Sequence, residues 1–216
     1  MGADRQIAGL LRQVASKDVV VLTHPFSVAS RLAALAYVAE QYGFAYVEAR
    51  RDEANKQAMN VYLYRDPSPE ARQREVATIS RYPQAGNGGP VPGMRPGTLK
   101  PDAGAREAVA RLKDRIGFDV LGDGLEKGPK RFVGGMFALV VLMTLLDGKY
   151  ILAKLVGGVA LGAALAGLFR LSALRRGRME QRLLDAGFVP VSDQYGRRRF
   201  LAAGEQLPGH ANPFAG

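Results

Sequence analysis

The chain contains no cysteine and no tryptophan, and only two histidines, His24 and His210, among its 216 residues. Without a thiol the protein can form no disulfide framework, no thiolate zinc site, no iron–sulfur cluster and no cysteine nucleophile. A secretory signal is also absent from the first residues, where charged side chains replace the hydrophobic segment of a leader. From the absence of cysteine and the presence of only two histidines, we predict neither a cofactor nor a metal site.

Basic residues outnumber acidic residues by 30 to 20, and the formal net charge is +10. Such an excess is typical of three classes of protein: those that bind nucleic acid, those that bind anionic membranes, and membrane proteins whose flanking charges set their topology. The distribution of apolar residues along the chain favours the third class, with membrane lipids as partners.

Two apolar runs, residues 132–146 and 151–169, follow each other with a short polar break between them. Thr144 is the only polar side chain of the first run, and Lys154 interrupts the second, so neither run has the polar stripe of an amphipathic helix. As helices they would span about 22 and 28 Å, against a hydrocarbon core of about 30 Å. We predict a transmembrane helical hairpin over 132–169; the alternatives are a re-entrant hairpin and a buried hairpin in a soluble core.

Basic residues flank both runs on one side, where they would set the topology or contact anionic lipid. They are Lys127, Lys130, Arg131, Arg170, Arg175, Arg176 and Arg178. The positive-inside rule then predicts an integral membrane protein with both termini in the cytoplasm. The Ala-, Gly- and Arg-rich composition favours a bacterial cytoplasmic membrane.

Small residues recur at four-residue spacing within both apolar runs, which favours close approach of helices in a membrane. They are Gly134, Ala138, Gly158, Gly162 and Ala166. Two interpretations follow: the two helices of one chain pack against each other, or copies of the chain form a homo-oligomer.

Residues 1–82 predict a cytoplasmic α+β module with the element order α-β-α-β-β-α. Ile7, Leu10, Leu11 and Val14 recur at helical spacing, and residues 19–23 form a β-branched run typical of a buried strand. A helix to about residue 42, strands at 44–51 and 59–65, and a helix opened by Ser68 complete the order. We expect a mixed three-stranded sheet with parallel first and second strands.

Three further segments surround the apolar runs. Residues 83–104 hold six glycines and five prolines, which predicts a flexible linker. Residues 105–131 predict a juxtamembrane helix, followed by a basic turn that contains Asp119 and Asp123; the helix lies on the leaflet or packs on the module. Residues 170–203 predict a basic helix and a β-hairpin, followed by a disordered tail at 204–216. The hairpin either joins the N-terminal sheet or pairs with another subunit.

Few residues are candidates for function. Arg197, Arg198 and Arg199 form the densest basic cluster outside the predicted membrane flanks, and they contact phosphate or an acidic partner, or else form a solvated strand edge. His24 follows a predicted strand, but no second histidine or known catalytic motif accompanies it. A structural role is therefore favoured for His24, and we predict that the protein is not an enzyme.

The leading hypothesis is a membrane-anchored interaction protein, a scaffold or adaptor that presents its α+β module to a cytoplasmic protein partner at the inner face of the membrane. The alternative is a membrane-active component of DNA transfer or envelope remodelling that acts through an oligomerising hairpin. Nucleic acid is not a favoured partner, because no predicted folded part of the chain is strongly basic by itself.

Overall fold

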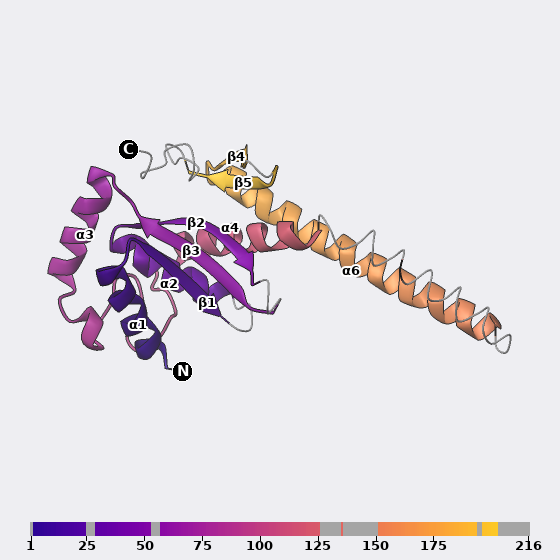
Figure 1. Cartoon of the computed structure of the whole chain (residues 1–216), viewed down its shortest axis with the longest axis horizontal. Coiled ribbons are helices and arrows are strands. Elements are labelled where there is room, and N and C mark those ends of the chain that lie inside the picture. Colours follow the sequence, from indigo (N-terminus) through magenta and orange to yellow (C-terminus); the bar gives the residue numbers. More distant parts are fainter. Residues whose placement is uncertain are drawn as a thin grey trace.

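The computed structural model describes residues 2–24, 29–52, 57–125, 135, 151–193 and 196–202, and these are the described part of the chain below. The first 82 residues have the predicted order of elements (Figure 1). These elements are α1 (Ala3–Ser16), β1 (Val19–His24), α2 (Ala29–Gln41), β2 (Phe44–Arg51), β3 (Met59–Arg65) and α3 (Pro69–Arg81).

The sheet formed by these strands is antiparallel throughout, with the order β1-β3-β2. β1 and β2 run in the same direction, as expected, but β3 lies between them and pairs antiparallel with both. The predicted mixed sheet is therefore wrong. Cross-strand pairs such as Val20 with Leu63 and Leu22 with Val61 give β1 an apolar neighbour in β3 on the buried face.

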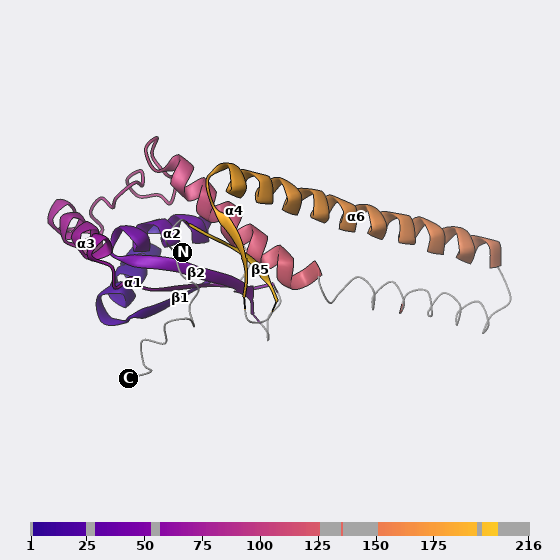
Figure 2. The ribbon, with the colours of Figure 1, turned by 90° about the horizontal axis from the view of Figure 1, so that it is seen from above.

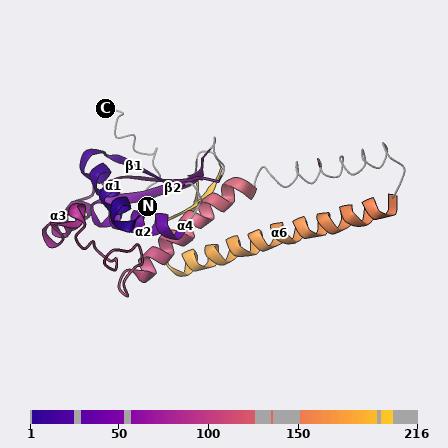
Figure 3. The same ribbon diagram turned by 90° about the horizontal axis from the view of Figure 1, so that it is seen from below.

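The core lies between the sheet and a layer of helices that covers one of its faces (Figures 2 and 3). α1 contributes the side chains that its spacing predicts, Ile7, Leu10, Leu11 and Val14, all of which are buried. α2 buries small and branched residues such as Leu32 and Val38 beneath the strands. No described helix covers the opposite face of the sheet.

The Gly/Pro-rich segment 83–104 packs on this core, whereas its composition predicts a free tether. Ala85, in the short helix η1 (Ala85–Asn87), is buried together with Val91 and Met94. Met94 also forms a β-bridge with Pro101. These spaced apolar side chains bury area that a Gly/Ser linker lacks, and proline reduces the conformational entropy lost when the segment is ordered.

α4 (Arg106–Leu125) packs on the module, which settles the choice left open for the predicted juxtamembrane helix. Val109, Leu112 and Ile116 lie on its buried side and join the core cluster. α6 (Ile151–Asp185) then runs back along α4, with Met179 within 3.2 Å of the Cβ position of Gly117, and its N-terminal part extends away from the sheet (Figure 2).

Among the helices that the structure describes, none has both the length and the apolarity needed to cross a membrane. This finding overturns the predicted transmembrane hairpin over 132–169, and with it the integral membrane localisation. The second apolar run is the first part of α6, which continues without a break through the Arg-rich segment. Nearly half of that run is Gly or Ala, whose small side chains carry little apolar area. Residues 132–146, except Gly135, lie outside the described residues.

The C-terminal hairpin forms a separate two-stranded sheet, β4 (Val189–Ser192) with β5 (Arg198–Leu201), and does not join the N-terminal sheet. Phe200 contacts Phe118 of α4 edge to face, with 4.9 Å between ring centroids. Leu183 of α6 completes this second apolar cluster. The hairpin is thereby held beside β2.

Candidate functional site

The three-stranded sheet has two outer edges, and the residues beside β2 close one of them. β2 has an irregular register between Tyr46 and Glu48, so Val47 is an extra residue that bends the strand, as in a β-bulge. The carbonyl of Val47 accepts a hydrogen bond from Arg199 at 3.5 Å, and the Ala49 amide donates to Asp119 at 3.4 Å. Side chains from β5 and α4 therefore satisfy backbone groups on the outer edge of β2.

Asp119 links this edge to the core. Its carboxylate accepts a hydrogen bond from the Tyr46 hydroxyl at 2.6 Å. Burial raises the pKa of Asp119 from 3.8 to about 6, although the Tyr46 hydrogen bond and the nearby Arg199 and Arg115 charges act in the opposite direction. Burial, followed by the charge of Asp119, raises the pKa of Tyr46 well above its usual value, so Tyr46 keeps its proton.

Arg199 holds the C-terminal hairpin to the same edge. Its guanidinium donates to Glu48 of β2, and to Asp193 at 3.0 Å. Arg197 donates to the same Asp193 oxygen at 2.9 Å. Only 8% of Arg199 is exposed. A buried arginine with two carboxylates is the arrangement expected where a charge has been removed from water and compensated.

Arg115 and Arg176 complete the surroundings of this network through aromatic contacts. The Arg115 guanidinium lies 4.8 Å from the Tyr46 ring centroid and 5.1 Å from that of Phe188. Arg176 lies 4.4 Å from the centroid of Phe118. The cavity beside Asp119 is only about 20 Å³, room for no more than one water molecule. The network thus supports the fold and leaves no space for a substrate.

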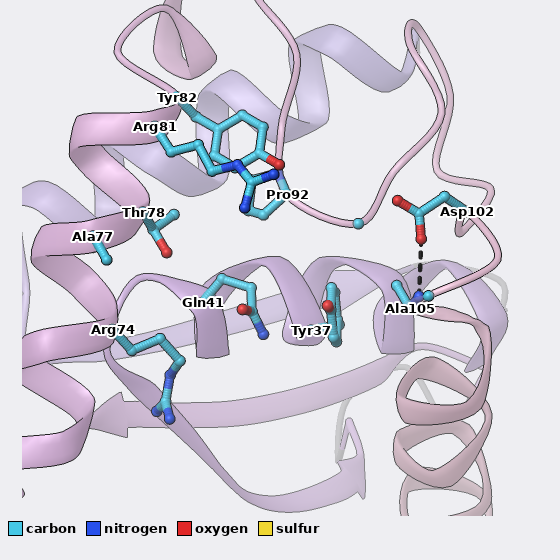
Figure 4. Close-up of a pocket in the computed structure, with 12 residues that line it drawn as sticks. Tyr37, Gln41, Arg74, Ala77, Thr78, Arg81, Tyr82, Pro92, Asp102 and Ala105 are labelled. Carbon is cyan, nitrogen blue, oxygen red and sulfur yellow. Dashed lines mark hydrogen bonds between the residues drawn. The ribbon is translucent and has the colours of Figure 1, made fainter.

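A larger cavity of about 340 Å³ lies between α2, α3 and the segment that precedes α4 (Figure 4). Its volume is in the range of small-molecule sites. Two of its charged groups already bind the fold, however: Arg74 donates to the Glu40 carbonyl at 2.8 Å, and Asp102 accepts from the Ala105 amide at 2.8 Å at the start of α4. Arg81 lies 5.8 Å from the Tyr82 ring centroid. The described side chains that line it include no catalytic arrangement such as a nucleophile paired with a base.

The second outer edge of the sheet, that of β1, is unlike the first. The Arg65 amide donates a hydrogen bond to the Asp18 carbonyl at 2.8 Å. Hydrogen-bonded and non-hydrogen-bonded pairs alternate along antiparallel strands, so the amides and carbonyls of Val19, Val21 and Thr23 point away from β3. Within the described part of the chain these groups have no backbone partner. Val19 is 57% exposed and Val21 is 37% exposed.

The same three residues also present their side chains on the uncovered face of the sheet. Val19 lies opposite Tyr64 of β3, and Val21 lies opposite Tyr62. Thr23 donates a hydrogen bond from its hydroxyl to the Asn60 side chain at 2.8 Å. The β1 edge, defined as Val19, Val21 and Thr23, therefore combines unpaired backbone with exposed β-branched side chains.

The predicted arginine cluster is largely used within the fold. Arg199 is buried, Arg197 pairs with Asp193, and Arg198 pairs with Glu180 at 2.7 Å. His24 lies at the end of β1 and is partly buried; burial, followed by the charge of Arg31, lowers its pKa. In the described part of the chain no group of three or more His, Asp or Glu side chains is placed to hold a metal ion.

The residues predicted for membrane contact and helix packing are not brought together. Four of the predicted flanking residues lie in α6: Arg170, Arg175 and Arg178 are exposed, and Arg176 faces Phe118. A Cβ at Gly162 would meet no atom within 4 Å. Lys127, Lys130, Arg131, Gly134 and Ala138 lie outside the described residues, as do the surroundings of Gly158 and Ala166.

Sequence reasoning missed both the Asp119 network and the β1 edge. Asp119 lies in α4, not in a turn, and it follows Ile116 by three residues, so helical spacing alone would have placed a carboxylate on the buried side. For β1, the β-branched run predicted a strand buried on both faces, whereas alternate residues are exposed.

Comparison with known proteins supplies no relative from which a role could be inferred. No family model, no curated protein and no solved structure matches the chain.

Proposed function

We propose that the protein is a non-catalytic interaction module, an adaptor that binds an extended segment of a protein partner as an additional strand beside β1. The adaptor role predicted from the sequence is kept, and the membrane anchor is not part of it. The observation that carries the proposal is the difference between the two outer edges of the sheet.

The β2 edge shows how this fold protects a strand. A bulge bends it, and a buried carboxylate and a buried guanidinium bind two of its outward backbone groups, the Ala49 amide and the Val47 carbonyl. Natural sheets commonly use such devices, because an unpaired edge is a template for pairing with another chain. Among the described residues none covers β1 in this way, and between Val19 and Thr23 the strand carries no charged side chain and no proline.

An uncharged, β-branched edge of this kind favours association. In strand addition the backbone hydrogen bonds supply affinity, and alternate side chains of the added strand supply specificity. Here the alternate side chains would lie beside Val19 and Val21, next to Tyr62 and Tyr64 on the uncovered face. Strand addition at β1 therefore favours a partner segment with apolar or β-branched residues at every second position.

A photo-cross-linking side chain at Val19, compared with one at Val76 of α3, tests this role in intact cells. Both valines are exposed, 57% and 67%, but only Val19 lies on the β1 edge. We expect one discrete adduct from Val19 and none of the same mass from Val76. The Val19 adduct should disappear when Val21 is replaced by proline, which removes the outward amide and leaves the bonds to β3 in place.

Hydrogen exchange gives an independent readout of the binding mode. In the isolated protein the Val21 amide should exchange faster than the Val20 amide, which is bonded to Leu63 of β3. In the complex the Val21 amide should become protected. Identical adducts from Val19 and Val76, or a complex in which the Val21 amide stays unprotected, would show that β1 is not the binding edge.

A further inference from the structure

From the register of β1 we infer that its partner strand is β1 of a second copy of the same chain. The inference rests on the proposed function, because it uses the same edge, and it adds the identity of the partner. Two copies would join antiparallel about a two-fold axis, and their sheets would become one continuous six-stranded sheet.

The geometry of β1 is self-complementary. In an antiparallel pair, hydrogen-bonded residues face each other with their amides and carbonyls directed across the gap. Val19, Val21 and Thr23 all have that direction, outward from β3. When Val21 sits on the two-fold axis, it lies opposite Val21 of the second copy, and Val19 lies opposite Thr23. All three outward residues are then paired.

Side-chain chemistry favours this register over the one shifted toward the start of the strand. Facing pairs of β-branched residues, Val21 with Val21 and Val19 with Thr23, are among the pairs that stabilise antiparallel strands. The same register sets Asp18 opposite His24 at both ends, a carboxylate against an imidazole. A shift of two residues toward the strand start would instead set Asp18 opposite Leu22 and bury an acid against an apolar side chain.

Charge also favours a copy over a strongly charged partner strand. Asp18 is the only acidic residue and His24 the only titratable base between residues 18 and 24. The Asp18 side chain is 87% exposed, and its ion pair with Arg65, at 3.3 Å, leaves it accessible to a facing strand. The edge thus offers one acid and one base at opposite ends, which is the pattern that a two-fold axis matches with itself.

The absence of cysteine makes the register directly measurable. Single cysteines introduced at Val21, Val19 or Thr23 would be the only thiols in the chain. Directly facing residues of a hydrogen-bonded pair have Cα atoms about 5.5 Å apart, within the range that a disulfide bridges. Val21→Cys should therefore form a disulfide-linked dimer in the purified full-length protein under mild oxidation.

The matched controls distinguish cross-linking in a defined strand register from cross-linking by random encounters between thiols. Thr23→Cys alone should not cross-link, because its two copies lie four residues apart along the paired strands, about 13 Å at the usual rise. A mixture of Val19→Cys and Thr23→Cys should cross-link, since those positions face each other. Equal cross-linking of Val21→Cys and Thr23→Cys would overturn the register.

The mass in solution tests self-pairing separately from the proposed function. Light scattering should give twice the chain mass of 23.2 kDa for the wild type and for Val76→Lys, and the single-chain mass for Val21→Pro and for Val21→Lys. Two different substitutions at Val21 are used so that misfolding of one does not decide the result, and the circular dichroism of both should match that of the wild type. A monomeric wild type with a discrete adduct to a different protein at Val19 would refute self-pairing and leave the adaptor role standing; a monomer with no adduct would refute both.

Discussion

Buried charge determines which single residues matter for stability. Arg198 and Arg199 are neighbours on β5, and both pair with glutamate, but their surroundings differ. The Arg199 side chain is 10% exposed and the Arg198 side chain is 51% exposed. An exposed ion pair contributes little to stability because water already solvates both partners. Removing one partner of a buried pair is costly because it leaves the other charge buried and uncompensated.

We therefore expect Arg199→Ala to lower the free energy of unfolding by about 3–5 kcal/mol, because Glu48 and Asp193 would lose their shared cation. Arg198→Ala should cost less than about 1 kcal/mol. Urea unfolding of the two variants measures both values. Equal losses would mean that the network near β2 is not the contact that holds the hairpin.

Asp119 should make stability depend on pH in the direction opposite to that of a salt-bridged acid. Its pKa rises from 3.8 in the unfolded chain to about 6 in the fold, so the folded protein binds more protons between these values. Its contribution to stability is therefore full below about pH 4 and falls as the pH rises through 6, by about 3 kcal/mol in all.

The Asp119→Asn variant, compared with the wild type in urea unfolding at intervals from pH 4 to 7, isolates this effect. Asparagine keeps an oxygen that can accept from Tyr46 but does not titrate. The difference between the two proteins should change across this range, while Glu107→Gln, at an 84% exposed side chain away from the β1 edge, should follow the wild type. A constant difference would show that burial does not raise the pKa of Asp119.

At the scale of elements, much of the N-terminal module could be predicted. Helical spacing located the buried face of α1, and the strands β2 and β3 lie at the predicted residues because alternation and turn residues are local signals. The position of β3 between β1 and β2 could not be predicted from local signals, because it depends on pairing between residues about forty positions apart in the sequence. Tyr46 and Asp119 are separated by 73 positions, so no local pattern links them.

The segment 83–104 shows why composition alone does not establish a linker. Glycine there serves two different purposes. Gly93 and Gly97 both have a positive φ, at +70° and +67°. A Cβ at Gly93 would lie 2.5 Å from the Tyr37 ring, whereas a Cβ at Gly97 would meet nothing within 4 Å. Gly93 is thus required for close packing on α2, and Gly97 for its turn alone.

Alanine substitutions at these two glycines test the packing of this segment. The cost of a positive φ, about 1 kcal/mol, is common to both. Gly93→Ala should lower the free energy of unfolding by about 1–3 kcal/mol more through overpacking against Tyr37, measured by thermal or urea unfolding. A freely moving tether would give equal losses at Gly93 and Gly97.

At the scale of the whole molecule, the prediction from the two apolar runs is wrong. A run without a polar stripe indicates contact with lipid, yet the run 151–169 belongs to a longer helix that continues into Arg175 and Arg176. Hydropathy counts glycine and alanine as apolar although they contribute little area for transfer. α6 ends at Asp185, well beyond the apolar run, so the run alone does not predict the length of the helix.

A paired dimer predicts that thermal stability depends on protein concentration. Mass action stabilises any folded species that assembles, so the midpoint temperature of the wild type should rise by about 2 °C for each tenfold increase in concentration. Val21→Lys should show a midpoint independent of concentration, and Val76→Lys should behave as the wild type does. Calorimetry over a hundredfold concentration range provides the measurement; a flat wild-type response would contradict pairing at β1.

Protection of the β2 edge by β5 also has a consequence in time. The ribosome completes β2 at Arg51, but Arg199, which bonds to Val47, is added about 150 residues later. At about 5–20 residues per second this leaves an interval of roughly 8–30 s in which the nascent sheet has two open edges instead of one. A chain that stops before Arg198 keeps the second edge open permanently. The arrival of β5 therefore changes the sheet from one with two open edges to one in which β1 is the edge with unpaired backbone groups.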